Sequence, residues 1–281
     1  MDFKFVKMHG TGNDFVVIDI RDMNNVNWQE LSGYICDRHF GIGADQLLLL
    51  DNTDIDEADY KMRIFNPDGS EVEMCGNGIR CFAKFASLYV ENKEKFVVET
   101  LAGLIIPEIK GDAVKVDMGI PELDGRKIPI NIDGRVIDYP LNIDGTEYKI
   151  TGVSMGNPHA VVKVDNVDSL QLEKIGSKFE NNSIFPNRIN TEFIEVVGEN
   201  ELKMRVWERG AGETLACGTG ASASTVAAIL NKWVTGPKVK LHLKGGDLEV
   251  EWNPDTNHLF LYGSAVEVFS GFANINNLKR R

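Results

Sequence analysis

Basic residues are scarce in this 281-residue chain, and long apolar runs are absent. Lys and Arg number 30 against 42 Asp and Glu, which gives a formal net charge of −12. Such a chain repels a phosphate backbone, so nucleic acid is a poor candidate partner. The basic Lys279-Arg280-Arg281 run is short, and we expect it to be a solvated tail rather than a binding arm.

No apolar segment approaches the roughly 20 residues that span a bilayer, and the sequence MDFKFVKMHGTGNDF lacks the apolar core of a signal peptide. We therefore expect a cytoplasmic protein that has no membrane partner. Cysteine is also rare, with only Cys36, Cys75, Cys81 and Cys217. In a reducing compartment these four are structural, metal-binding or catalytic rather than a disulfide framework.

Several common cofactor motifs are missing. There is no C-x-x-C pair, and neither Asp37-Arg38-His39 nor Pro158-His159 has the spacing of metal ligands, which disfavours a metal site. Gly10-Thr11-Gly12 and Gly41-Ile42-Gly43 lack the third glycine of a dinucleotide fingerprint, and no phosphate-binding G-x-x-x-x-G-K-[ST] loop occurs. The sequence thus predicts neither a metal nor a nucleotide cofactor.

An internal repeat is the main positive feature. Lys61–Cys81 aligns without a gap on Lys203–Ala223, 142 positions later, with seven identities that include Cys75 on Cys217. A looser repeat places Gly12-Asn13-Asp14-Phe15 near Gly156-Asn157-Pro158-His159, at an offset of 144. Because the length also favours two domains of about 140 residues, we interpret the chain as a duplication with one thiol in each half.

Strand patterns dominate both halves, with apolar β-rich runs separated by Gly, Asn, Asp and Pro. Helical spacing of apolar residues follows Cys75 and Cys217, although the second stripe is displaced by two residues, and weaker helices are predicted at Trp28–Asp37 and Leu170–Phe179. The pattern predicts an α/β (α+β) fold of two pseudo-symmetric domains, each a curved, mostly antiparallel sheet around a central helix. We expect the domains at 1–118, completed by 265–281, and at 119–264.

Each thiol precedes Gly, a residue that can cap a helix, Gly, and then the helix itself. Unpaired N–H groups and the positive end of the dipole would lower a thiol pKa and bind a carboxylate. One thiol on each face of an α-carbon, in a cleft between the domains, could remove a proton from one side and return one from the other. A lone buried cysteine is usually a small hydrophobe, and we assign only that role to Cys36 and Cys81.

Five blocks of the sequence resemble the diaminopimelate epimerase family, in the order of that family and over residues 3 to about 265. They are Met8-His9-Gly10-Thr11-Gly12-Asn13-Asp14-Phe15, Asp37-Arg38-His39-Phe40-Gly41-Ile42-Gly43-Ala44-Asp45, Met74-Cys75-Gly76-Asn77-Gly78-Ile79-Arg80-Cys81, Gly156-Asn157-Pro158-His159, and Trp207-Glu208-Arg209-Gly210-Ala211-Gly212-Glu213-Thr214 to Thr219.

The resemblance implies a cofactor-free homodimeric isomerase that interconverts LL- and meso-diaminopimelate in lysine and cell-wall precursor biosynthesis. It implies that Cys75 and Cys217 are the two bases and that His159 and Glu208 help to set thiol protonation. The substrate contacts that it implies are Asn13, Gln46, Asn66, Gly76, Asn77, Asn157, Asn190, Glu208, Arg209, Gly218 and Thr219.

Other roles stay open for several of these residues. A doubly zwitterionic substrate would use Glu208 for an ammonium group and Arg209 for the distal carboxylate. Asn13 and Asn66 could be turn residues only, and Asn77 and Thr219 could be helix caps only. Arg63 and Arg205 are repeated on strands, where structural ion pairs are the expected role.

Two other functions compete with the epimerase. A proline racemase would share the two-thiol plan, but its first motif typically has His where Asn77 stands here, and Glu208-Arg209 suits a longer substrate. A non-catalytic two-lobed protein that binds an amino acid would have no use for paired thiols, so replacing Cys75 or Cys217 would leave its affinity intact.

Overall fold

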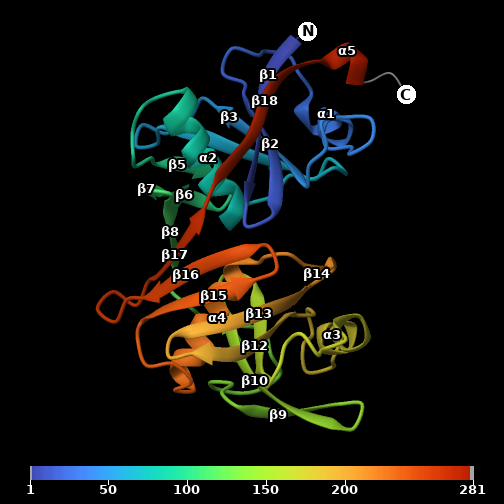
Figure 1. Cartoon of the computed structure of the whole chain (residues 1–281), viewed down its shortest axis with the longest axis vertical. Helices are drawn as coiled ribbons and strands as arrows, with labels where there is room; N and C mark the ends of the chain where they lie inside the picture. Colours follow the sequence, from blue (N-terminus) through green and yellow to red (C-terminus); the bar gives the residue numbers. More distant parts are fainter. Residues whose placement is uncertain (1, 279–281) are drawn as a thin grey trace. The chain divides into compact units, whose positions relative to one another are not determined.

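The computed structural model describes residues 2–278, so the predicted tail Lys279-Arg280-Arg281 lies outside the described residues. Contacts divide the described chain into two compact units, residues 2–116 with 263–278, and Asp117–Tyr262. The fold is α+β, with two sheets and few helices (Figure 1). Within residues 2–278, no helix has the length and apolarity that crossing a bilayer requires.

The first sheet has seven strands in the order β18-β1-β2-β3-β4-β5-β6. Most neighbours are antiparallel, and only β2–β3 and β4–β5 are parallel. Its elements are β1 (Asp2–Gly10), β2 (Asn13–Asp19), α1 (Trp28–Ile35), β3 (Gln46–Asp51), β4 (Tyr60–Phe65), α2 (Gly76–Tyr89), β5 (Val98–Thr100), β6 (Gly103–Ile105), β18 (Val266–Asn274) and α5 (Ile275–Leu278).

The second sheet has eleven strands, in the order β7-β8-β17-β16-β15-β13-β12-β11-β10-β9, with β14 paired to β13. Its strands and the accompanying helices are β7 (Glu108–Lys110), β8 (Ala113–Gly119), β9 (Tyr139–Ile143), β10 (Thr146–Ser154), β11 (Pro158–Lys163), α3 (Leu172–Glu180), β12 (Asn190–Gly198), β13 (Glu201–Glu208), β14 (Gly212–Thr214), α4 (Gly218–Leu230), β15 (Lys238–Leu243), β16 (Gly246–Trp252) and β17 (Leu259–Ser264).

The duplication predicted from the sequence is present in the strand pairing. β2, β3, β4 and α2 recur as β11, β12, β13 and α4, with a parallel pair followed by an antiparallel pair in both cases. In the parallel pairs Phe15 lies opposite Gln46, and His159 lies opposite Asn190. The register thus makes Phe15 equivalent to His159 and Gln46 equivalent to Asn190.

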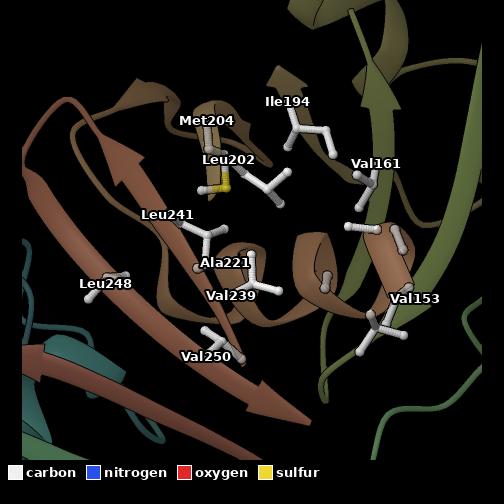
Figure 2. Packing of buried hydrophobic residues seen from close by; sticks show 14 of the residues in the cluster. Val153, Val161, Ile194, Leu202, Met204, Ala221, Val239, Leu241, Leu248 and Val250 are labelled. Atoms are coloured by element: carbon white, nitrogen blue, oxygen red, sulfur yellow. The ribbon is translucent and has the colours of Figure 1, made fainter. Parts of the chain in front are cut away.

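The core of the second unit surrounds α4, which is buried from Ala221 to Ala228 on all sides. Figure 2 shows side chains from several strands, such as Val161, Ile194 and Leu241, gathered around Ala221. The helix is rich in Ala, Ser and Gly, and these small residues allow close approach by the strands. This wider buried face explains why the apolar stripe of α4 does not coincide with that of α2.

The strand-rich pattern predicted for both halves is confirmed, and the predicted helices are present as α1, α2, α3 and α4. The sequence did not predict β6, β7 and β14, which have only three residues each, nor β9, nor the short α5. A strand of three residues is too short to show an alternating pattern, so its pairing comes from the neighbouring strand.

We expect Gly176→Ala to destabilise the second unit. A Cβ at Gly176, in α3, would lie 2.2 Å from a ring atom of Trp207. Overpacking of this kind costs about 1–3 kcal/mol, more than the ~1 kcal/mol that Ala gains over Gly in a helix. Urea unfolding followed by circular dichroism should show a lower midpoint, whereas Lys174→Ala, on the exposed face of the same helix, should not; equal midpoints for the two variants would contradict the packing argument.

Candidate active site

The two thiols occupy the same position in their units, as N-caps of α2 and α4. Cys75 and Cys217 have nearly equal extended backbones, with φ of −135° and −130°. Each Sγ accepts a hydrogen bond from the backbone N–H three residues later, Gly78 at 3.4 Å and Gly220 at 3.3 Å. Both sulphurs therefore lie at the positive end of a helix, where free N–H groups also favour an anion.

Around Cys75 lies a group of amides. The Cys75 Sγ is 3.6 Å from the Asn13 Oδ1, which also accepts from the Asn77 Nδ2 at 3.3 Å. The Asn13 Nδ2 donates to Asp45 at 3.0 Å, and Arg38 holds Asp45 through a contact of 2.7 Å. The structure thus joins three of the predicted site residues, and Asn13 serves as more than a turn residue.

A second pair of predicted residues in the first unit consists of Gln46 and Asn66. The Gln46 Nε2 donates to the Asn66 Oδ1 at 2.8 Å, and the Asn66 Nδ2 donates to the Ser70 hydroxyl at 2.9 Å. Asn66 also forms the turn predicted from its sequence, because its backbone carbonyl accepts from the Gly69 N–H at 3.0 Å. A turn role and a polar side-chain role coexist here.

In the second unit the predicted residues form a connected chain that ends at Cys217. The His159 Nε2 is 3.0 Å from the Asn157 Oδ1, and the Asn157 Nδ2 donates to the Thr219 hydroxyl at 3.3 Å. The Thr219 hydroxyl is in turn 3.4 Å from the Cys217 Sγ. Through the repeat, Asn157 and Thr219 correspond to Asn13 and Asn77, so the same contact is built twice.

Asn190 positions the segment that carries Arg209. The Asn190 Nδ2 donates to the Pro158 carbonyl at 2.8 Å, and its Oδ1 accepts from the Arg209 N–H at 2.9 Å. The exposed Arg209 guanidinium donates to the Asn187 carbonyl at 3.1 Å, and no ion pair of the described residues includes it. Glu208 accepts a short hydrogen bond from the Thr214 hydroxyl.

Burial, together with two acidic side chains, raises the pKa of Cys217. Burial raises its pKa well above the usual range, and the charges of Glu208 and Glu192 raise it further, while hydrogen bonds from Thr219 and the Gly220 N–H act in the opposite direction. Burial likewise raises the pKa of Glu208, whose hydrogen bond with Thr214 lowers it in part.

The surroundings of Cys75 differ from those of Cys217, because a buried cation lies near Cys75. The Arg80 guanidinium donates to the Gly76 carbonyl at 3.1 Å, to the Thr11 hydroxyl at 2.7 Å and to the Ser264 carbonyl at 3.2 Å. Burial lowers the Arg80 pKa, and interaction with Cys81 and Cys75 raises it. Arg80 has no ion pair with any described residue, so Cys75 lies near a positive charge and Cys217 lies near negative ones.

Sequence reasoning missed Glu192 and Arg80 as parts of the site. Glu192 is fully buried on β12, and its Oε1 is 2.7 Å from the His159 Nδ1. The repeat could have indicated Glu192. At an offset of 144, Glu192 aligns with the apolar Leu48, so the second half has a charged residue where the first half has an apolar one. Arg80 lay inside a recognised block, but a fully buried arginine without an acidic partner has no signature in a single sequence.

The remaining sequence predictions concern structural residues. Arg63 pairs with Glu71 and Arg205 pairs with Glu213, each at 2.7–2.8 Å, which confirms the predicted ion pairs. Cys36 and Cys81 are buried, and burial raises the pKa of each thiol to about 12, in keeping with the packing role expected of them. No group of His, Cys, Asp and Glu within residues 2–278 is arranged to hold a metal ion.

Comparison with known sequences shows that the chain is similar to diaminopimelate epimerases. The model of the diaminopimelate epimerase family matches residues 5–123 and 151–268. One relative, the diaminopimelate epimerase of Acetivibrio thermocellus, is 51% identical over 282 residues, which covers 98% of this chain and all of that protein.

Solved structures with much lower sequence identity share the fold. A Bacillus anthracis phenazine biosynthesis protein of the PhzF family has a TM-score of 0.68 at 16% identity, covering 98% of this chain and 99% of that chain. A hydroxyproline epimerase from Agrobacterium vitis, with bound trans-4-hydroxy-L-proline, has a TM-score of 0.66 at 14% identity, covering 97% and 91%. At such identities the likeness establishes the fold alone.

We expect Glu208→Gln to lower the pKa of Cys217, because the Glu208 charge is one of the causes that raise it. The pH at which Cys217 is half-maximally reactive with iodoacetamide should therefore move to lower pH, as measured by peptide mass spectrometry. Glu173→Gln, an exposed acidic position on α3, is the matched control and should leave the profile in place. A Glu208→Gln profile equal to the wild type, or displaced to higher pH, would show that Glu208 does not act on this thiol through its charge.

Proposed function

The chain belongs to the diaminopimelate epimerase family and epimerises diaminopimelate, and we propose that Cys75 and Cys217 are the two bases of the reaction. The observation that carries this proposal is their matched geometry. Each thiol caps a helix at the equivalent place of a duplicated unit, and each accepts a hydrogen bond from a glycine N–H. Core cysteines such as Cys36 and Cys81 have no comparable setting.

The proposed reaction exchanges one proton on each face of the α-carbon. One sulphur, as thiolate, takes the α-proton, and the electrons of the C–H bond move onto the carboxylate to give an enolate-like anion. The other sulphur, as thiol, donates its proton to the opposite face, so the centre inverts and the charge passes to the second sulphur. The reverse reaction exchanges these roles, and the shared charge makes the two thiols a coupled pair.

Stabilisation of the anion is the second requirement. The backbone N–H groups of Gly76 and Asn77, and of Gly218 and Thr219, lie in the first turns of α2 and α4. Preorganised donors of this kind contribute about 3–4 kcal/mol each when they face developing charge. We propose that these groups bind the carboxylate of the reacting centre.

The remaining polar residues suit a substrate with two amino-acid ends. We propose that Asn13, Gln46 and Asn66 contact it from the first unit, and Asn157 and Asn190 from the second. The Arg209 guanidinium, exposed and outside every ion pair of the described residues, would bind the distal carboxylate in bidentate fashion. Glu208 would bind an ammonium group, and with His159 it would also adjust the protonation of the thiols.

Neither competing function is favoured. The proline racemase alternative rests on a fold shared with distant structures, whereas the family match and the 51% identity both concern diaminopimelate epimerases. A non-catalytic binding protein would not need two thiols as helix caps. We further propose lysine and peptidoglycan precursor biosynthesis as the biological role and the cytoplasm as the location, the latter supported by four cysteines that form no disulfide.

We also propose a homodimer in which a second copy covers the outer edge of β18. This strand ends the seven-stranded sheet, so its outer edge has no neighbouring strand in that sheet. Several of its side chains are apolar and exposed, among them Val268 (55% accessible) and Phe272 (77% accessible). An open edge with apolar side chains is a site for pairing with another chain, and an isologous pairing of two β18 strands would satisfy it.

Two-base catalysis is tested with LL-diaminopimelate in D₂O, followed by proton NMR on reduced, chelator-treated protein free of added pyridoxal phosphate. We expect the α-proton signal to disappear as the meso isomer forms. Cys75→Ala and Cys217→Ala should each lower the epimerisation rate by at least about 10²–10⁴, since each removes one acid–base group. Cys81→Ala, a buried thiol outside the site, is the matched control and should retain the rate.

The outcomes separate the possible explanations. Epimerisation that persists in either catalytic-thiol variant would refute the assignment of that thiol as a base. A folded wild type that shows no exchange with LL-diaminopimelate would redirect the assay to L-proline. If that substrate also failed, the amino-acid-binding alternative would be preferred.

Phe272→Glu tests the dimer, because a charge placed on each copy would be forced into the apolar interface. We expect sedimentation velocity to show a dimer for the wild type and a monomer for the variant. Leu101→Glu, which adds a charge at an exposed apolar residue away from β18 (58% accessible), should remain dimeric. A Phe272→Glu protein that is still dimeric would exclude β18 as the interface.

A further inference from the structure

A buried carboxylate that the two-base reaction does not require lies against the start of α4. Glu192 is fully buried on β12, and its Oε1 is 2.7 Å from the Nδ1 of the equally buried His159. Its Oε2 has no hydrogen-bond partner among the described residues. A Cβ added at Gly220 would lie 2.6 Å from the Glu192 Oε1. Glu192 thus lies directly against the first turn of the helix that Cys217 caps.

The first unit shows that the fold does not need charge at this position. There the equivalent of Gly220 is Gly78, and a Cβ at Gly78 would contact Leu48 at 3.4 Å and Phe15 at 3.5 Å. The strand register makes Leu48 equivalent to Glu192 and Phe15 equivalent to His159. An apolar pair therefore supports α2, whereas a buried carboxylate and imidazole support α4. Because a buried charged pair is often less stable than an apolar replacement, its presence in only one unit indicates a role other than packing.

Hydrogen-bond donors and acceptors can be assigned along the chain that connects Glu192 to Cys217. The His159 ring lies between two acceptors, the Glu192 Oε1 and the Asn157 Oδ1 at 3.0 Å. It satisfies both only when each ring nitrogen carries a proton. Asn157 then presents its Nδ2 to the Thr219 oxygen at 3.3 Å, which leaves the Thr219 hydroxyl proton free to point at the Cys217 Sγ, 3.4 Å away.

We propose that Glu192 is a positioning residue of the epimerase: it keeps His159 doubly protonated, which fixes the Asn157 amide and directs the Thr219 hydroxyl proton at the sulphur of Cys217. The inference rests on the proposed role of Cys217. If His159 lost a proton, its Nε2 would become an acceptor and the Asn157 amide would turn over. The Thr219 proton would then go to the Asn157 oxygen, and the Cys217 thiolate would lose a donor.

We call the connected side chains of Glu192, His159, Asn157 and Thr219 the relay. It has a chemical purpose in a reversible two-base reaction. In one direction of the reaction Cys217 must be the thiolate, although burial and the charges of Glu208 and Glu192 favour its neutral form. A doubly protonated His159 balances the charge of Glu192, and the directed Thr219 hydroxyl adds a donor to the thiolate. The relay therefore makes the charged form of Cys217 accessible.

The titratable groups around the relay come from few elements. Glu208, at the end of β13, and Cys217, before α4, face it, while β10 places the apolar Val153 opposite His159. Direct repulsion by the Glu192 charge and the relay through Thr219 have opposite effects on Cys217. Removal of the charge alone would ease ionisation of the thiol, whereas loss of the relay would hinder it.

The test is Glu192→Gln, assayed by the pH dependence of iodoacetamide alkylation at Cys217. We expect the midpoint to move to higher pH by up to about one unit, since the loss of one hydrogen bond to the thiolate outweighs the removal of the Glu192 charge. In ¹⁵N-histidine-labelled protein, the ring-nitrogen shifts of His159 should differ between the wild type, in which both nitrogens donate, and the variant, in which one of them accepts. A midpoint that is unchanged, or displaced to lower pH, would overturn the proposal.

A double-variant cycle shows whether the effect passes through Thr219. In a Thr219→Val background, where no hydroxyl remains, adding Glu192→Gln should not move the Cys217 midpoint to higher pH, because only the loss of the Glu192 charge is left to act; a further shift to higher pH would refute the relay. Thr191→Val is the matched control and should keep the wild-type profile. It lies on the same strand as Glu192, and it replaces a buried hydroxyl that has no hydrogen-bond partner among residues 2–278.

The test also covers a Glu192→Gln protein that does not fold. If Glu192→Gln does not fold, the combined His159→Phe and Glu192→Leu variant reproduces the apolar pair of the first unit, and it should show the same shift to higher pH. Alkylation and NMR need no turnover, so they report on the relay separately from the proposed function. Full epimerase activity in Cys217→Ala would remove the catalytic role of that thiol and would leave the relay measurements standing.

Discussion

The hydrogen bond from a glycine N–H to a cysteine sulphur at the start of a helix is the interaction on which the site depends. It occurs twice, from Gly78 to Cys75 and from Gly220 to Cys217. Ser, Thr, Asp or Asn normally fills this N-cap position. A cysteine there gives up some helix stability but places a sulphur beside the free N–H groups of the first turn. In the proposed reaction, the same backbone groups bind the anion that forms when the sulphur takes the α-proton.

The two units share a backbone plan but differ in charge. The proposed reaction requires such a difference, because its two thiols must hold unequal protonation states. Strand pairing and helix caps repeat closely. Side chains at equivalent positions do not, since Phe15 and Leu48 correspond to His159 and Glu192, and the buried Arg80 corresponds to Ser222. Cys75 therefore lies near a buried cation, and Cys217 lies near buried acids. The repeated backbone gives each unit one sulphur at a helix start, as the proposed two-base reaction requires, and the unsymmetric side chains give the two thiols different electrostatic surroundings.

Much of this arrangement could be predicted from the sequence, because equivalent positions of the repeat carry the same residue types. The offset of 142 aligned the cysteines, their glycines and the arginines of the two ion pairs, and the strand patterns predicted most of the sheets. Glu192 could not be predicted, since a Glu on a strand usually faces solvent. Only the parallel register of β11 and β12, together with the glycine of α4, places this carboxylate inside. The burial of α4 on all sides could not be predicted either, because it results from contacts with several strands.

The glycines that follow the cysteines have more than one reason to be glycine. From the sequence, a missing Cβ would let a ligand approach the backbone. For Gly220 the structure adds a second reason, because a Cβ there would lie 2.6 Å from the Glu192 carboxylate. At Gly78 the nearest atoms are 3.3–3.5 Å away, so the first helix is less restricted by the residues beneath it. The buried carboxylate of Glu192 therefore requires glycine at position 220. A side chain at Gly220 would displace Glu192 from His159, and the proposed relay to Cys217 would be disturbed.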